Sequence, residues 1–347
     1  MENLTTGYVN ISNTTVDIAS SSQPMWQVNF HLIAYPISAL LAILLNCANL
    51  VTVPQVSNCF GENTKLCLMC LAVVDLFTGL ICSTSGVLFV LVPIPQSVYY
   101  TILILCTAFV WQSMLILTLA SVDRYIAVTQ PLQYFVLASR KRMIVALTAV
   151  VIFPLILSAV SYLQSILRGI CPPFATFCIS GSITPSHVVY NIIPFTAVVI
   201  TTFVNVRLVS IARRHALQIA AIEAAVNSGN VALPLPTSAG MKGLKTVLAV
   251  TCVFYLAWLP STIINILSPI PRINVPIALS LIVRYAITSN SWWNACVYWI
   301  MNKSYRNVLL KMLPFRFGTC IRSCDATAQS PLHNQVHVAY IPPRSER

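Results

Sequence analysis

Very few side chains in this chain of 347 residues are able to do chemistry, and they are embedded in apolar segments. Asp75 is the single acid within a long apolar run, and Asp123 and Arg124 stand side by side at the end of another. An ionisable side chain is costly to bury in such surroundings, which makes each a candidate functional residue. A lone buried carboxylate needs a compensating partner, or is protonated in a hydrogen-bond network, so Asp75 is the first candidate.

The other reactive residues form no catalytic constellation. The histidines are scattered over loops, ends and tail: His31, His187, His215, His333 and His337. The twelve cysteines mostly stand singly in apolar runs, where cysteine acts as a small hydrophobic residue. We therefore expect no enzyme activity and no cofactor that would take part in catalysis.

The composition indicates a membrane protein. Charged residues make up 8% of the chain and hydrophobic residues 57%, with a mean hydropathy of +0.80, whereas soluble domains carry about 25% charged residues. The net charge of +12 is not arranged in the continuous basic stripe of a nucleic-acid groove, so we expect no nucleic-acid partner.

Seven apolar runs reach the length of about 20 residues that a helix needs to cross a bilayer. They lie near residues 30–54, 66–92, 98–128, 143–165, 187–211, 244–268 and 275–301. Their hydrophobicity is continuous rather than alternating, which excludes a membrane β-barrel. The sequence predicts an all-α membrane protein, a seven-transmembrane helix bundle, without the internal repeats typical of transporters.

The remaining segments divide the chain into four parts. Residues 1–29 form a polar tail, 30–301 the bundle, 302–314 a short amphipathic eighth helix on the inner leaflet, and 315–347 a cytosolic tail. The connection 215–241 is rich in Ala, Ser, Gly and Pro and is predicted to be a flexible loop. In the last tail, Cys320 and Cys324 are candidates for palmitoylation or are free thiols.

Two signals predict an extracellular N-terminus in the plasma membrane. Asn3, Asn10 and Asn13 each begin a glycosylation sequence in the first tail. With that tail outside, 17 of the 20 Lys and Arg residues lie in cytosolic segments, whose net charge is +12 against +1 outside. Such an excess is typical of cytoplasmic loops.

Motifs in five of the runs resemble those of the rhodopsin-like (class A) G-protein-coupled receptors. They are Leu71-Ala72-Val73-Val74-Asp75, Asp123-Arg124-Tyr125, Phe254 to Pro260 around Trp258, Asn290-Ser291 with Asn294 to Tyr298, and Asn49 in the first run, with Asn46 as its alternative. The resemblance covers residues 30–313 and implies heterotrimeric G proteins, arrestin and membrane lipids as partners.

The resemblance also implies roles for named residues. A sodium or polar network would comprise Asn49, Asp75, Ser113, Asn290 and Asn294. The activation switch would comprise Asp123, Arg124, Tyr125, Phe254, Trp258, Pro260 and Tyr298, with Phe254, Pro194 and Met114 as a packing relay. Arg124 would pair with Asp123 at rest and leave it as the sixth helix moves outward. The alternatives are a surface ion pair at Arg124 and plain aromatic packing at Trp258.

Several residues depart from the family pattern. Tyr99 stands where most members have the cysteine that bridges to the second outer loop. That loop holds Cys171 and Cys178, which implies an intraloop disulfide as in cannabinoid and sphingosine-phosphate receptors, or else two free thiols; melanocortin receptors share this departure. Ala295 replaces the seventh-helix proline, Thr202 a fifth-helix tyrosine, and Gly240 an acidic partner of Arg124. We therefore predict raised basal signalling.

The ligand is constrained mainly by Arg284, which can clamp a carboxylate or phosphate, or else extends to the outer interface. Cys106 stands where amine receptors have an aspartate, and the seventh run has no lysine for a retinal Schiff base. The ligand-site candidates are Cys106, Phe109, Val110, Tyr255, Trp258, Ser261, Arg284 and Ile287. Their apolar character favours a lipid-like or small hydrophobic anionic ligand.

Two further interpretations stay open. The stretch from Asp123 to Tyr134 also resembles odorant receptors, although these keep the cysteine that Tyr99 replaces. A receptor-like protein that has lost coupling is the other alternative.

Overall fold

The computed structural model describes residues 10–11, 15–17, 24–56, 61–168, 185–227, 249, 252–264, 275–301 and 303–312. The chain divides into two compact units, Met1–Leu309 and Leu310–Arg347. Of the second unit, only the last residues of one helix belong to the described part.

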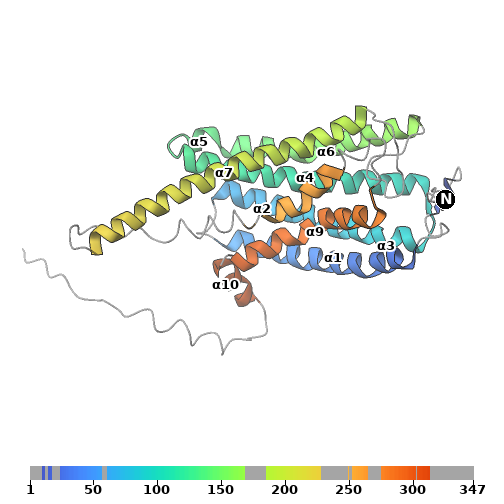
Figure 1. Ribbon diagram of the computed structural model, residues 1–347, viewed down its shortest axis with the longest axis horizontal. Coiled ribbons are helices and arrows are strands. Elements are labelled where there is room, and N and C mark those ends of the chain that lie inside the picture. Colours follow the sequence, from blue (N-terminus) through green and yellow to red (C-terminus); the bar gives the residue numbers. More distant parts are fainter. Residues whose placement is uncertain are drawn as a thin grey trace, which may run out of the picture. The chain divides into compact units, whose positions relative to one another are not determined.

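Helices dominate the described chain (Figure 1). They are α1 (Met25–Thr52), followed by the 3-10 turn η1 (Val53–Gln55), α2 (Glu62–Phe77), the π-helical segment η2 (Thr78–Ser83), α3 (Thr84–Leu91), α4 (Gln96–Thr129), α5 (Tyr134–Leu137), α6 (Arg140–Arg168), α7 (Pro185–Asn227), the helix Cys252–Ile264, α9 (Ile277–Met301) and α10 (Lys303–Met312). The all-α class is thereby confirmed.

Five helical segments within the described residues are long and apolar enough to cross a membrane. They are Met25–Gln55, Glu62–Leu91, Gln96–Thr129, Arg140–Gln164 and Ile192–His215. They coincide with the first five predicted runs, while the helix Cys252–Ile264 and α9 lie within the sixth and seventh. The complete bundle of seven spans and the membrane position of α10 stay predictions.

The structure changes two of the predicted boundaries. Helix α1 begins at Met25 rather than near residue 30. Helix α7 continues to Asn227, so the prediction of a flexible loop was wrong for residues 215–227. This stretch is rich in Ala with Leu and Glu, residues of high helix propensity, and the Gly and Pro residues on which the loop prediction rested lie beyond it.

A small antiparallel sheet includes part of the polar N-terminal tail. Strand β1 (Asn10–Ile11) pairs with β2 (Thr15–Asp17), and β2 pairs with β3 (Ile94–Pro95), which lies between α3 and α4. The tail is thereby hydrogen-bonded to the connection between two predicted spans. Strands of two or three residues are too short for a periodic sequence signal.

Helix α4 lies at the centre of the packing. It contacts α2, α6 and α7, while α1 contacts α2, η2, α3 and α9. Trp111 and Met114 of α4 share the main buried cluster with Phe254 and Trp258 of the helix Cys252–Ile264. In η2, Gly79 lies against Ala42 of α1.

The N-terminal end of α4 is held by an aromatic cluster. Tyr99 is buried with Ile94, Leu103 and Tyr162, and its ring centroid lies 4.9 Å from that of Phe89. Apolar packing therefore anchors this end, where most members of the resembled family would have a disulfide.

Candidate functional site

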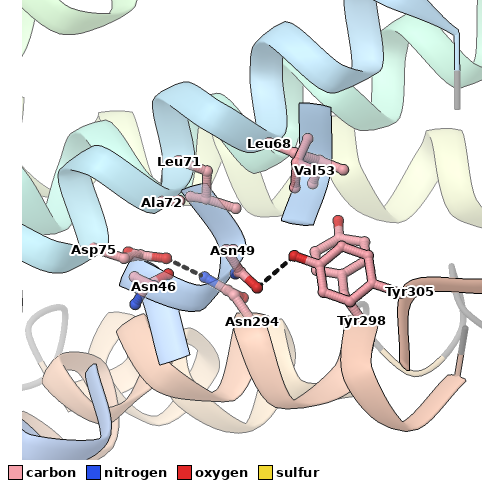
Figure 2. Close-up of a pocket in the computed structure, with 10 residues that line it drawn as sticks. All are labelled: Asn46, Asn49, Val53, Leu68, Leu71, Ala72, Asp75, Asn294, Tyr298 and Tyr305. Carbon is pink, nitrogen blue, oxygen red and sulfur yellow. Dashed lines mark hydrogen bonds between the residues drawn. The ribbon is translucent and has the colours of Figure 1, made fainter. Parts of the chain in front are cut away.

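Asp75 of α2 is fully buried and faces α9. Its Oδ2 accepts a hydrogen bond of 3.1 Å from Asn294 Nδ2. A cavity beside this pair has room for about one water molecule. Figure 2 shows the lining residues Asn46, Asn49, Val53, Leu68, Leu71, Ala72, Asp75, Asn294, Tyr298 and Tyr305. The structure thus brings Asp75 and Asn294 together, as the polar network requires.

Three buried oxygen atoms of the predicted network lack hydrogen-bond partners within the described part of the chain. They are Asp75 Oδ1, Ser113 Oγ and Asn290 Oδ1. The Ser113 hydroxyl lies near Asp75 without the geometry of a normal hydrogen bond. An unsatisfied buried polar atom is costly, and oxygen atoms are the ligands that hard cations prefer. This donor set therefore fits a sodium ion or water.

The two asparagines of α1 have different partners. Asn46 Nδ2 donates to the backbone oxygen of Ser291 in α9 at 3.0 Å and to that of Ala42 at 2.9 Å. Asn49 Oδ1 instead accepts hydrogen bonds from Trp299 and from Tyr305, the second of which is drawn in Figure 2. Asn46, the alternative, thus makes the contact with the turn between Asn290 and Asn294, and Asn49 turns toward α10.

Asp123 is surrounded by neutral donors. Its Oδ1 accepts from Tyr134 Oη at 2.9 Å and from Asn63 Nδ2 at 3.5 Å, and its Oδ2 accepts from Thr64 Oγ1 at 3.2 Å. Burial, and then the hydrogen bond to Asp123, raise the pKa of Tyr134, which keeps this phenol protonated. Asn63, Thr64 and Tyr134 were not among the predicted site residues, although the first two are polar residues at the start of an apolar run.

Arg124 points elsewhere, and the expected ion pair with Asp123 is not formed. Arg124 Nη2 donates to Thr64 Oγ1 at 2.5 Å. Within the described residues, the ion pairs are Lys65–Glu62 at 2.9 Å and Arg140–Glu62 at 4.0 Å. Adjacent residues of a helix do not face each other, so one hydroxyl, that of Thr64, bridges the carboxylate and the guanidinium.

Trp258 and Phe254 lie in the main core, with ring centroids 6.4 Å apart. Met114, Val110 and Ile287 belong to the same buried cluster, and Phe109 packs against it while stacking on Phe77. Trp258 Nε1 has no hydrogen-bond partner among the described residues. The predicted relay residues Phe254 and Met114 are therefore close to Trp258, while Pro194, the third, lies within α7.

Tyr255 has a different role from the one expected. Its hydroxyl donates to Thr202 Oγ1 of α7 at 2.5 Å, linking two helices rather than pointing into a ligand site. Tyr125 likewise contacts α7, its ring centroid lying 6.2 Å from that of Phe203.

Arg284 of α9 lies within electrostatic range of the phenols of Tyr35 and Tyr99. Cys106 is also near Tyr35, and its sulfur lies 3.9 Å from Ser85 Oγ. The structure thus gathers the predicted residues Arg284 and Cys106 around Tyr35. Tyr35 was not among the predicted site residues, although it is an aromatic residue with a polar hydroxyl near the start of the first apolar run.

The other predicted residues are distributed as follows. Ser261 is buried in the helix Cys252–Ile264, Pro260 is half-buried beside it, and Tyr298 lines the cavity. Asn10 lies in β1. Asn3, Asn13, Cys171, Cys178, Cys320 and Cys324 lie outside the described residues.

Comparison with known proteins identifies the family. The family model described as 7 transmembrane receptor (rhodopsin family) matches residues 40–298. G-protein coupled receptor 52 of Mus musculus is 25% identical over 224 residues, which are 63% of this chain and 62% of that receptor. Probable G-protein coupled receptor 21 is 25% identical in Mus musculus over 346 residues and in Homo sapiens over 342, in both cases 92% of this chain and 96% of the relative. Because the family match runs through about three quarters of the chain, the protein belongs to the rhodopsin family of seven-transmembrane receptors, which are not enzymes.

Proposed function

We propose that this protein is a plasma-membrane receptor, with its N-terminus outside the cell, that binds a hydrophobic anionic ligand and activates heterotrimeric G proteins. Membership of the receptor family supports a receptor function. The names of the relatives, G-protein coupled receptors 52 and 21, support a G protein as the partner. The observation that carries the proposal is the Thr64 bridge between Asp123 and Arg124 at the predicted cytosolic end.

Arg124 is held by a neutral hydroxyl rather than by a carboxylate. Such a bond is weaker than the bidentate pair of a guanidinium with a carboxylate. Arg124 is therefore released at low cost when the helix Cys252–Ile264 moves outward. This arrangement favours signalling in the absence of ligand.

The segment between α4 and α6 offers an apolar surface for the G protein. Leu132 is 97% exposed and Phe135 82% exposed, on either side of the Tyr134 that is bonded to Asp123. Exposed apolar side chains that lie together mark interaction sites. Arrestin would compete for the same end of the receptor, and exposed Lys303 and Arg306 of α10 would face anionic lipids.

The helix Cys252–Ile264 transmits ligand binding. Ligand contact with Trp258 shifts its ring, which shifts the neighbouring ring of Phe254. Pro260 lacks a backbone N–H, which weakens the helix two residues after Trp258 and permits it to bend. A sodium ion held by Asp75, Ser113 and Asn290 would compensate the buried carboxylate and stabilise the resting arrangement.

The ligand class follows from Arg284. This guanidinium lies near two neutral phenols, those of Tyr35 and Tyr99, which are able to donate to an anion. A carboxylate carries one negative charge and matches one guanidinium bidentately. The apolar residues Val110 and Ile287 of the core would contact the hydrophobic part of such a ligand.

Agonist-free recruitment of a promiscuous G protein tests the coupling. We expect recruitment above mock for the wild type and a fall to mock for Arg124→Ala, at equal surface expression. Lys141→Ala removes an exposed basic residue of α6 and should leave recruitment unchanged. A wild-type receptor that reaches the surface and recruits no G protein would contradict the proposal and favour the receptor-like protein without coupling.

A screen of fatty acids, lysophospholipids and small acids tests the ligand. Arg284→Ala should abolish a response that Arg284→Lys retains in part, because lysine keeps the charge but not the bidentate geometry. Equal responses in Arg284→Ala and wild type would contradict this ligand class.

A further inference from the structure

Asn49 joins three helices through one oxygen atom. Its Oδ1 accepts hydrogen bonds from Trp299 Nε1 at the end of α9, at 3.1 Å, and from Tyr305 Oη in α10, at 2.5 Å. An amide oxygen has two lone pairs, so both are used. A single acceptor in α1 thus positions the inner end of α9, through Trp299, and the start of α10, through Tyr305 (Figure 2).

The Tyr305 side chain is anchored by packing as well as by its hydroxyl. It is 1% exposed and packs with Val53, Val56 and Leu68. Burial raises the pKa of Tyr305 to about 12, so the phenol is a donor at every physiological pH. A buried polar network whose members are satisfied specifies one arrangement of its helices.

Trp299 is fixed at two points. Its indole N–H binds Asn49, and its backbone oxygen accepts a hydrogen bond of 3.2 Å from Arg306 Nη1, which also binds the oxygen of Ile300. The last carbonyls of α9, which have no partner within that helix, are thereby satisfied from α10. The junction of α9 and α10 consequently moves as one body, and Asn49 is its polar contact with α1.

The junction borders the cavity that contains Asp75. Figure 2 places Asp75 at one end of this cavity and Tyr305 at the other, with Asn49 and Asn294 between them. A displacement of the inner end of α9 relative to α1 therefore affects both the Asn294–Asp75 hydrogen bond and the donors of Asn49.

We propose that Asn49, Trp299 and Tyr305 form a latch that holds α9 and α10 against α1 in the resting receptor and opens when the receptor couples. The described arrangement is a resting one because Arg124 is bonded inside the bundle to Thr64. The latch as a structural unit stands on its own hydrogen bonds, whereas its effect on signalling rests on the proposed coupling to G proteins.

Hydrogen–deuterium exchange of the purified full-length receptor tests the latch. Tyr305→Phe keeps the ring and removes the hydroxyl, Trp299→Phe removes the indole N–H, and Asn49→Ala removes the acceptor. We expect exchange of residues 299–309 to be about three- to tenfold faster in Tyr305→Phe and in Trp299→Phe, each of which loses one hydrogen bond. Exchange should be faster still in Asn49→Ala, which loses both. Adding Tyr305→Phe to Asn49→Ala should change little, because the acceptor is already absent.

Tyr162→Phe is the matched control. It removes a buried phenol hydroxyl that lies 3.3 Å from Thr107 Oγ1, between α4 and α6. Exchange at residues 299–309 should equal that of wild type in this control. Unchanged exchange in Tyr305→Phe, or fully additive effects in the double variant, would overturn the latch.

Agonist-free G-protein activation per surface receptor tests the regulatory effect. We expect about a two- to fivefold increase in Tyr305→Phe and Trp299→Phe, because the resting arrangement loses stabilisation. Faster exchange with unchanged activation, in a receptor whose Arg124→Ala variant loses its basal signal, would overturn the regulatory role. If Arg124→Ala has no effect, the proposed coupling fails, and the exchange result alone decides whether the latch exists.

Discussion

A Cβ atom added to Gly79 in η2 would lie 2.6 Å from the Cβ of Ala42 in α1. Two Cβ atoms do not approach this closely in real structures. The packing of η2 against α1 therefore leaves no room for a methyl group at position 79. Ala42 is fully buried and has no rotamer through which to retreat.

Gly79→Ala is therefore expected to destabilise the receptor by about 1–3 kcal/mol, the usual cost of overpacking. The cost should appear although alanine favours a helix over glycine by about 1 kcal/mol. The apparent melting temperature in lipid nanodiscs measures it, and Ala42→Gly in the same chain should recover part of the loss. If Gly79→Ala alone melts at the wild-type temperature, η2 and α1 move apart at no cost, and the prediction is wrong.

Tyr99 is expected to hold the end of α4 in place by packing, where most family members have a disulfide. Tyr99→Ala should cost about 3–5 kcal/mol, as for other large aromatic side chains removed from a core. Tyr99→Phe preserves the contacts with Phe89 and Tyr162, so it should keep the melting temperature and lose only affinity for an anionic ligand. If both variants melt alike, the ring is not the anchor.

Sodium should stabilise the receptor through Asp75. At ten to a hundred times its dissociation constant, the ion would contribute about 1.4–2.7 kcal/mol to the free energy of unfolding. Melting should shift upward in sodium chloride relative to choline chloride at equal ionic strength, and Asp75→Asn should abolish the shift. Asp123→Asn is the control that keeps it. An equal melting temperature in the two salts would exclude sodium in favour of water alone.

Thr64→Val should raise basal signalling about threefold, because it removes the hydroxyl that holds Arg124, together with the hydrogen bond of that hydroxyl to Asp123. The measurement is agonist-free G-protein activation at equal surface expression. Thr78→Val is a matched control, since the Thr78 hydroxyl at the start of η2 donates to the Val74 carbonyl of the adjoining α2, a local hydrogen bond. A similar rise in both variants would mean that any loss of a hydroxyl in this region loosens the receptor.

The hydrogen bond from Tyr134 to Asp123 should not respond to pH near neutrality. Burial and Asp123 raise the pKa of Tyr134 above its ordinary value of 10.0. A raised pKa favours the protonated group in the folded state, so its contribution is complete below pH 10 and is lost only above it. The effect of Tyr134→Phe on the melting temperature should accordingly be the same at pH 6 and pH 8.

The sequence predicts the helical class well because hydrophobicity over about 20 residues is a strong signal. It locates the five apolar helices and the pairing of Asp75 with Asn294. It does not decide between Asn46 and Asn49, which are three residues apart on one face of α1 and differ only in the depth at which they meet α9. It also misplaces Arg124, since a motif of adjacent residues carries no information on which neighbours each side chain faces.

The features that the sequence did not predict depend mostly on contacts between distant segments. Thr64 and Tyr35 acquire their importance from partners in other helices, Arg124 and Arg284 respectively. The helix at residues 215–227 was missed for a local reason. Helix propensity there extends α7 beyond its apolar part, and the apolar part alone was used to place its end.

Helix α9 has a mechanical property that follows from Ala295. This residue keeps the backbone N–H that a proline would lack, while Asn46 still donates to the carbonyl of Ser291 one turn earlier. Helix α9 is thus hydrogen-bonded to α1 at its middle, through Asn46, and keeps its full backbone hydrogen bonding there. A displacement of the turn that carries Arg284 is then expected to tilt the whole of α9 about its contact with Asn46. Trp299, beyond that contact, would move in the opposite direction, because α9 does not bend between the two.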